Sequence, residues 1–218
     1  MAHDTASNDP TASAGTTPVQ PIDASMIETV GVLGSGIMGS GLAEVLARSG
    51  RRVVLRSRTL DGARAVVAKV DRNLGRQVEK GKLADDEREQ IVALITPTAD
   101  LADLAECDLV VESVVEDLDV KKALFAELDE IVKPGAILAT NTSTLPVVEL
   151  AMVTSRPESV VGIHFFNPAP MTKLVEVIHP ITAADDTVKT ALLFAESLGK
   201  DAVEVADRAG FIVNALLF

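Results

Sequence analysis

The stretch ETVGVLGSGIMGSGLAEVLARSG, Glu28 to Gly50, decides the fold class of this chain. It opens with a β-branched, apolar run typical of a buried strand and ends in a helical pattern that stops at Gly50. Between the two stand Gly34, Gly36 and Gly39, in the spacing G-x-G-x-x-G. The first glycine permits a tight turn, the second lets the backbone approach a pyrophosphate, and the third lets the helix pack close to the sheet. In this strand–turn–helix context the motif predicts a dinucleotide-binding loop.

The helix that follows this loop supplies the other half of a phosphate site. Its first residues, Ile37 and Met38, belong to the turn where free backbone N–H groups and a partial positive charge face an anion. We therefore count both residues, with the three glycines, as candidate cofactor-binding positions.

The remainder of the chain alternates between short apolar runs and longer helical patterns. We expect strands over residues 51–57, 94–97, 108–115, 134–143, 158–166, 173–180 and 201–207, and helices over residues 60–80, 84–93, 118–132 and 185–198. This order predicts an α/β fold, with a Rossmann-like, doubly wound and mostly parallel sheet that is covered by helices on both faces.

The same pattern divides the chain into three segments. Residues 26–209 are the expected dinucleotide-binding Rossmann domain. Residues 1–25 are rich in Ala, Ser, Thr and Pro and hold no Lys or Arg, which predicts a disordered leader rather than a secretory signal or transit peptide. Residues 210–218, GFIVNALLF, are typical of the first turns of a helix with nothing to bury, so we expect them to begin a truncated C-terminal helical domain.

Composition narrows the class of partner and the compartment. The chain has 32 acidic and 20 basic residues and a formal net charge of -12, which argues against nucleic acid or an anionic membrane as the main partner. Cys107 is the only cysteine, which excludes an internal disulfide and a cysteine-built metal site. It stands in ECDLVVES, an apolar run that predicts a strand, and we interpret it as a small buried hydrophobic residue. No apolar run approaches the roughly 20 residues that cross a bilayer. We expect a cytoplasmic protein that needs no metal.

The tip of the second strand departs from the usual dinucleotide-binding pattern. About 20 residues after the glycine loop, an Asp or Glu normally binds the adenosine ribose, but this chain has Arg56, Ser57 and Arg58 there. A guanidinium can bind a 2′-phosphate in bidentate fashion, and a serine leaves room for it. Our hypothesis is that the cofactor is NADP or NAD with NADP preferred; the alternative is two solvated arginines beside an NAD site.

A histidine and a glutamate stand out as candidate catalytic residues. His164 ends an apolar strand, where a parallel sheet places its ligand crevice, and Glu176 lies in the next apolar strand, where a carboxylate is costly unless it is paired. The short loop between the strands can bring the two together. Such a pair can accept the proton of an alcohol while hydride leaves for a nicotinamide. Neutral hydrogen-bonding groups stand at nearby strand ends: Asn141, Ser143 and Asn167.

Five motifs in order resemble the 3-hydroxyacyl-CoA dehydrogenase family, especially its bacterial 3-hydroxybutyryl-CoA type. They are GSGIMGSGLAEVLARSG, VVESVVEDLDVKKALFAELD, NTSTLP, GIHFFNPAP followed by KLVEV, and GFIVN, and they extend from about Ile27 to the end of the chain. The resemblance implies reversible oxidation of an (S)-3-hydroxyacyl-CoA to the 3-oxoacyl-CoA, in fatty acid or butanoate metabolism. It also implies a homodimer formed through a C-terminal helical domain that closes over the acyl-CoA.

The resemblance assigns roles to individual residues. His164 and Glu176 become the catalytic pair, Ser143 polarises the substrate, and Asn167 and Asn214 assist. The other family positions fall on cofactor contacts at Glu116, Lys121 and Asn141 and on a CoA contact at Lys80. For the charged residues among these, a solvated helix face or a helix-entry acid is the alternative.

Two rival functions stay open at this stage. One is the 3-hydroxyisobutyrate or 6-phosphogluconate dehydrogenase group, which shares a G-x-G-x-M-G loop but relies on a catalytic lysine. The other is a non-catalytic dinucleotide-binding or regulatory module. We expect these 218 residues alone to bind the nucleotide but to turn over poorly.

Overall fold

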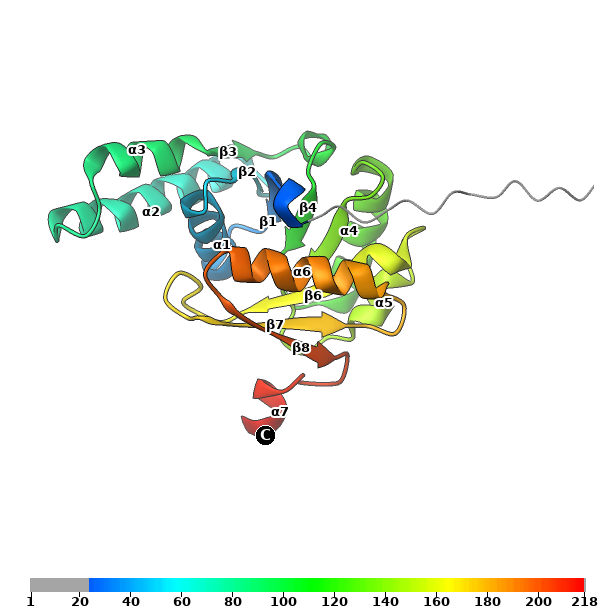
Figure 1. Ribbon diagram of the computed structural model, residues 1–218. Coiled ribbons are helices and arrows are strands. Elements are labelled where there is room, and N and C mark those ends of the chain that lie inside the picture. Colours follow the sequence, from blue (N-terminus) through cyan, green and yellow to red (C-terminus); the bar gives the residue numbers. More distant parts are fainter. Residues whose placement is uncertain (1–23, 218) are drawn as a thin grey trace, which may run out of the picture.

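The computed structural model describes residues 24–217, so residues 1–23, which make up most of the expected leader, and Phe218 lie outside it. The described chain is built on one eight-stranded sheet with the strand order β3-β2-β1-β4-β5-β6-β7-β8 (Figure 1). Its strands are β1 (Thr29–Leu33), β2 (Arg52–Arg56), β3 (Ile95–Thr98), β4 (Leu109–Glu112), β5 (Ile137–Thr140), β6 (Val160–Phe165), β7 (Leu174–His179) and β8 (Asp201–Ala206).

Every neighbouring pair of strands is parallel except β6 and β7, which are antiparallel. The predicted mostly parallel, Rossmann-like sheet is therefore confirmed. Because β1, β4, β5 and β6 all run the same way, their carboxyl ends lie along one edge of the sheet, where folds of this class place a ligand crevice. The exception has a simple cause: only a short loop separates β6 from β7, and a parallel return needs a long crossover.

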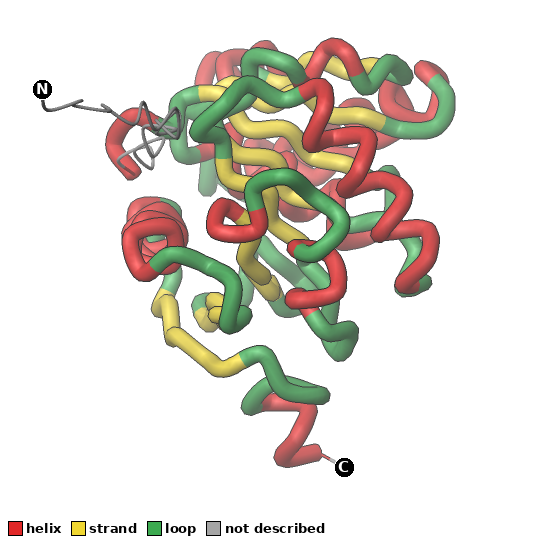
Figure 2. The backbone as a smooth tube through the Cα atoms, turned by 90° about the vertical axis from the view of Figure 1, so that its right-hand side faces the viewer, coloured by secondary structure: helices red, strands yellow, loops and turns green. Residues whose placement is uncertain are grey.

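Helices cover both faces of the sheet, as Figures 1 and 2 show. One apolar layer packs α1, α2 and α6 against the strands, and the other packs α4 and α5 against the opposite face. The helices are α1 (Ile37–Arg48), α2 (Leu60–Glu79), α3 (Asp85–Ala93), α4 (Leu118–Ile131), α5 (Val147–Ala151), α6 (Asp185–Ser197) and α7 (Val213–Leu217).

Two expected strands end earlier than their apolar runs suggest, and both end at side chains that bind the backbone. After Glu112 the amide of Val114 donates to the carboxylate of Glu112 itself, 2.6 Å away, instead of joining the sheet. After Thr140 the amide of Thr142 donates to the Thr140 hydroxyl at 3.2 Å. A side chain that takes a backbone N–H in this way competes with the strand ladder.

Three smaller expectations need correction. Residues 24–26 form a short 3-10 helix with Ala24 buried, so the disordered leader does not extend to residue 25 as predicted. Cys107 is buried, as expected, but in the turn before β4 rather than in a strand, and burial, with Asp108 next to it, raises the pKa of its thiol to about 12. The five-residue helix α5 is too short to show a helical period and was not expected.

Candidate active site

The glycine loop is shaped by close backbone approaches. Gly34 has a φ of 123°, and a Cβ there would lie 2.2 Å from the carbonyl oxygen of Ser113, so only glycine fits. A Cβ on Gly39 would lie 2.0 Å from the Gly34 carbonyl oxygen, which confirms close packing of α1 on the loop. Gly36 differs, because a Cβ there would meet nothing within 4 Å. The backbone at Gly36 is therefore open to a ligand.

The start of α1 has the features of an anion site. Its N-cap is Gly36, and no side chain caps the free N–H groups of the first turn. Of the two residues expected to contribute there, Ile37 is exposed, whereas Met38 packs against the core. The loop and the helix start together fit the pyrophosphate of a dinucleotide.

The tip of β2 separates its two arginines. The guanidinium of Arg56 donates through Nε to the carbonyl of Ala99 at 3.3 Å, which ties it to the neighbouring loop. Ser57 is buried, and Arg58 is exposed. Arg58 is thus the better placed of the two to meet a phosphate that comes from solvent.

His164 and Glu176 stand directly opposite each other on the antiparallel strands β6 and β7. His164 Nδ1 lies 2.9 Å from Glu176 Oε2, and the two side chains are only 8% and 2% exposed. The sequence prediction that the short loop brings this pair together is confirmed. Since Nδ1 is engaged with the carboxylate, Nε2 is the ring atom left to exchange a proton with a substrate.

The second oxygen of Glu176 holds the end of the described chain. Glu176 Oε1 accepts hydrogen bonds from the amides of Ile212 at 3.1 Å and Val213 at 2.9 Å, at the start of α7. The ring of Phe211 lies 5.9 Å from the imidazole of His164, centroid to centroid. These two hydrogen bonds satisfy the second carboxylate oxygen of Glu176, which would be costly to bury without partners. The segment expected to bury nothing therefore docks on the pair formed by His164 and Glu176.

Asn141, Ser143 and Asn214 gather at the carboxyl end of β5. Asn141 Oδ1 accepts from the amide of Phe165 at 2.8 Å, which links β5 to the end of β6 beside His164. Asn214 Nδ2 donates to the carbonyl of Ser143 at 3.1 Å. Ser143 and Asn214, which the resemblance assigns to the substrate, thus come from two separate segments and lie close together, and the cofactor candidate Asn141 stands two residues before Ser143.

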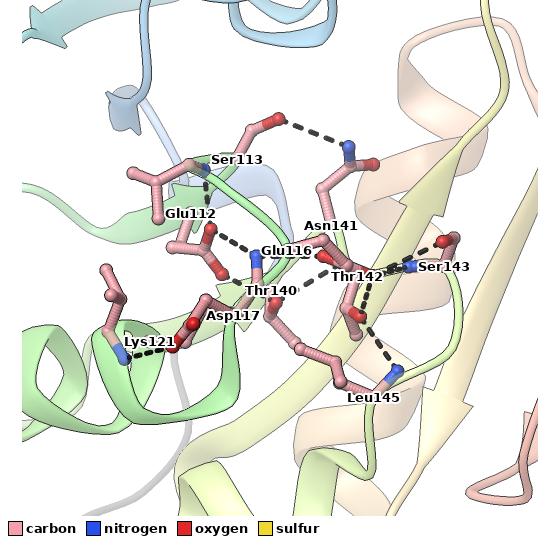
Figure 3. Close-up of polar contacts among 12 residues, drawn as sticks. Glu112, Ser113, Glu116, Asp117, Lys121, Thr140, Asn141, Thr142, Ser143 and Leu145 are labelled. Carbon is pink, nitrogen blue, oxygen red and sulfur yellow. Dashed lines mark hydrogen bonds and ion pairs between the residues drawn. The ribbon is translucent and has the colours of Figure 1, made fainter.

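Glu116 and Lys121 belong to a network of polar contacts that Figure 3 shows in close-up. Lys121 is 1% exposed, so the alternative of a solvated lysine is wrong. Its ammonium lies 2.6 Å from Glu112 Oε1 and 3.3 Å from Glu116 Oε2. Glu116 Oε1 in turn accepts from the amide of Ser143 at 2.8 Å and from the hydroxyl of Thr142 at 2.5 Å (Figure 3).

The charge of Glu116 is stabilised by this network. Burial acts to raise the pKa of its carboxyl, but the hydrogen bonds from Thr142 and Ser143 and the charge of Lys121 outweigh it, so the pKa lies below the usual value. Glu116 is therefore an anion that faces Ser143 at neutral pH.

Asn167 and Lys80 lie on a separate groove of about 350 Å³ between α1, α2 and the loop of residues 167–171. Three basic side chains line it: Lys69 and Arg76 of α2, and Lys80, the C-cap residue of that helix. The loop wall is fixed by Lys200, whose buried ammonium donates to the carbonyls of Ala169 at 2.6 Å and Thr172 at 2.8 Å. Burial lowers the pKa of Lys200.

Sequence reasoning missed Glu112 and Lys200. Glu112 has a signal in the sequence, because it interrupts an otherwise apolar strand pattern as Glu176 does. Its partner Lys121 is a helical residue nine positions away and gives no pattern of its own. Among residues 24–217 there is no group of three His, Cys, Asp or Glu side chains that could hold a metal ion. No helix in that same range is long and apolar enough to cross a membrane.

Comparison with known proteins points to one family. The family model described as "3-hydroxyacyl-CoA dehydrogenase, NAD binding domain" matches residues 29–208. A 3-hydroxybutyryl-CoA dehydrogenase of Mycobacterium tuberculosis is 43% identical over 197 residues, which cover 88% of this chain and 68% of the relative. A 3-hydroxyadipyl-CoA dehydrogenase of Escherichia coli is 40% identical over 188 residues, which cover 86% of this chain and 40% of that protein.

Solved structures agree with the sequence matches. The crystal structure of Mycobacterium tuberculosis FadB2 superposes with a TM-score of 0.85 at 44% identity, over 88% of this chain and 68% of the other. Relatives of different printed substrate thus match at almost equal identity, so the comparisons establish the family but not the acyl group. The matched model names NAD, and nothing in the comparisons supports a preference for NADP.

Proposed function

This chain belongs to the 3-hydroxyacyl-CoA dehydrogenase family through its NAD-binding domain, and we propose that it interconverts an (S)-3-hydroxyacyl-CoA and the corresponding 3-oxoacyl-CoA. The first substrate to test is 3-hydroxybutyryl-CoA, since the 43% identical relative carries that name. The observation that carries the proposal is the 2.9 Å contact between His164 Nδ1 and Glu176 Oε2 at the carboxyl end of β6.

In the oxidative direction His164 takes the proton of the substrate 3-hydroxyl on Nε2, and the C3 hydride leaves as the carbonyl forms. Glu176 holds the imidazole in the tautomer with the proton on Nδ1 and stabilises the imidazolium that results. In the reductive direction the same imidazolium returns its proton to the 3-oxo oxygen. A bound NAD(H) supplies or accepts the hydride.

Ser143 and Asn214 support this step at the substrate oxygen. The Ser143 hydroxyl donates to Glu116 Oε1 at 3.2 Å in the structure, and it would polarise the 3-oxo group after turning from Glu116 to the substrate. Asn214 holds the Ser143 carbonyl at 3.1 Å. Asn141 is assigned to the nicotinamide side, because its amide oxygen binds the backbone of Phe165 next to His164.

The dinucleotide is assigned to the glycine loop and the network beyond it. Gly34, Gly36, Ile37 and the start of α1 would hold the pyrophosphate, because a Cβ at Gly36 meets nothing within 4 Å and the helix start has no side-chain cap. Of the two charged cofactor candidates, Glu116 is 39% exposed and Lys121 only 1%, so Glu116 is the better placed to meet the cofactor directly, with Lys121 behind it at 3.3 Å.

The acyl-CoA is assigned to the groove that contains Asn167 and Lys80. Its basic lining from α2 suits the phosphates of CoA, in contrast to the acidic balance of the whole chain. A non-catalytic nucleotide-binding module has no use for both a buried His–Glu pair and a basic groove, so the enzyme is the favoured interpretation.

The test is the reduction of acetoacetyl-CoA by the purified chain with NADH and, separately, NADPH, and then with longer 3-oxoacyl-CoAs. We expect loss of NADH absorbance that depends on acetoacetyl-CoA. The relatives are longer than the region matched here, and we predict a lower kcat for these 218 residues than for the Mycobacterium tuberculosis relative assayed alongside. A chain that binds NADH but never oxidises it, even at enzyme concentrations equal to the substrate, would favour the non-catalytic module.

A further inference from the structure

Glu112 is a carboxylate at the centre of the sheet that the proposed reaction does not use. It is the last residue of β4 and is 0% exposed. A buried carboxylate is costly unless charges and hydrogen bonds compensate it. Three donors do so here: the amide of Val114 and the ammonium of Lys121, both 2.6 Å from Oε1, and the hydroxyl of Thr140, 2.7 Å from Oε2.

Its position joins the loops of the candidate site. In the register of the sheet Glu112 lies between Leu33, just before the glycine loop, and Thr140, just before Asn141. The amide of Asn141 donates to the Glu112 carbonyl at 2.8 Å, and the amide of Ser113 donates to the Leu33 carbonyl at 2.7 Å. Glu112 therefore anchors the point where the cofactor side and the substrate side of the site meet.

A chain of charged contacts leads from Glu112 to Ser143. Glu112 binds Lys121, Lys121 binds Glu116, and Glu116 binds the amide of Ser143 (Figure 3). Glu116 is 39% exposed, so it can follow its cation or turn to solvent. Glu116 is held at Oε1 by Thr142 and Ser143 and at Oε2 by Lys121. The shorter ionic contact of Lys121 is the one to Glu112.

We propose that Glu112 is a positioning residue that, through Lys121 and Glu116, sets the place of Ser143. This inference rests on the proposed function, because that function gives Ser143 its role at the substrate. The effect of Glu112 on the position of Ser143 can be tested without it. The competing explanation gives Glu112 a structural role only, as the counter-charge that lets Lys121 be buried.

Two variants and one control separate these explanations. Glu112→Gln keeps the volume but removes the charge that fixes Lys121. Glu112→Gln combined with Lys121→Met removes both charges, so no uncompensated ion is left inside and folding is preserved. The control is Asp129→Asn, which breaks an ion pair of similar length, 2.7 Å to Arg156, on the far part of α4.

The measurements are the crystal structure, the Tm and the acetoacetyl-CoA reductase kcat of each protein. If Glu112 positions Ser143, Glu112→Gln separates Glu116 from the Ser143 amide to beyond hydrogen-bond distance and lowers kcat about tenfold or more below that of Asp129→Asn. The double variant recovers the Tm, but the contact stays broken and kcat stays low.

The inference is overturned if Glu116 stays on the Ser143 amide in Glu112→Gln, or if the double variant recovers both the contact and kcat. The second result would give Glu112 the counter-charge role alone. If Glu112→Gln does not fold, the double variant decides. An unmutated chain without reductase activity would count against the proposed function, while the crystal structures would still decide the role of Glu112.

Discussion

At the scale of single residues, burial divides the charged side chains of the site into two kinds. Lys121, Glu112 and Glu176 are almost fully buried and have partners that fix them. Arg58 is exposed, and its charge is screened by water unless a ligand excludes it. Contacts to the buried groups can therefore be read from the structure, whereas the effect of Arg58 depends on what binds beside it.

Arg58 gives a direct test of the coenzyme hypothesis. Arg58→Glu replaces a charge that attracts a 2′-phosphate by one that repels it, so we expect the Kd ratio of NADPH to NADH to rise about tenfold or more. Fluorescence titration of both reduced coenzymes measures the ratio, and the absence of Trp and Tyr leaves the nicotinamide signal clean. Arg56→Glu serves as the comparison, since Arg56 is tied to Ala99. An unchanged ratio in Arg58→Glu would end the NADP hypothesis.

Some of these buried site residues could be predicted from the sequence and others could not. His164 and Glu176 interrupt two apolar strands that a short loop joins, so both the residues and their contact follow from the pattern. The burial of Lys121 does not, because an isolated lysine in a helix usually lies in water. Its partner Glu112 comes from a strand, and only the packing of α4 against the sheet brings the two together.

At the scale of elements, periodicity predicted the long helices and the strands well, because helices such as α2 and α4 bury one apolar face and strands β4, β5 and β6 are buried along their whole length. The ends of β4 and β5 could not be predicted, since Glu112 and Thr140 take backbone N–H groups away from the sheet. The short helix α5 is positioned by Asp207, which accepts from the amides of Val147 and Val148, across sixty residues of chain. Contacts of that kind leave no local pattern.

Two substitutions in the glycine loop should have different effects, one on coenzyme binding and the other on thermal stability. Gly36→Ala should fold normally, because a Cβ there meets nothing within 4 Å, but should weaken NADH binding about tenfold by occupying the space next to the backbone. Gly34→Ala should lower the Tm, because its Cβ would lie 2.2 Å from the Ser113 carbonyl at a φ of 123°. Thermal melts and NADH titrations measure both effects.

The matched control for the loop is Gly75→Ala in the middle of α2. A Cβ there also meets nothing within 4 Å, and alanine stabilises a helix interior by about 1 kcal/mol relative to glycine. We expect a small rise in Tm and unchanged NADH affinity. If Gly36→Ala binds NADH as tightly as Gly75→Ala does, the loop is not the pyrophosphate site.

At the scale of the whole molecule, lowering the pH should reduce the free energy of unfolding, because it protonates carboxylates whose pKa lies below the usual value. Burial acts to raise the pKa of Asp108, but hydrogen bonds from Lys133 and from the amides of Thr29 and Glu28 outweigh it and hold the pKa below the usual 3.8. A group with a lowered pKa stabilises the fold above its unfolded pKa and loses that contribution as the pH falls through its folded pKa. Asp108 also ties the start of β1 to the turn before β4.

The substitution Asp108→Asn removes the charge of this carboxylate and keeps the shape of the side chain, so it measures the contribution of the Asp108 charge. At pH 7 we expect the variant to be less stable than the unmutated chain by about 1–3 kcal/mol, from the hydrogen bonds lost to a charged group. The difference should shrink as the pH falls below 3.8, where the carboxyl of the unmutated chain becomes protonated as well. Urea unfolding at a series of pH values measures it. A difference that stays constant down to the lowest pH would show that the charge of Asp108 does not stabilise the fold.

In the proposed reaction His164, held by Glu176, exchanges the proton of the substrate alcohol. The most direct test of this step is a single-turnover experiment, in which protein loaded with NADH is mixed in excess with acetoacetyl-CoA and the oxidation of NADH is followed. For His164→Gln we predict a rate about 10²–10⁴-fold lower than that of the unmutated chain, with the Kd for NADH changed by less than about threefold. A variant that oxidises NADH at the unmutated rate would contradict the claim, because the proton would then come from another group.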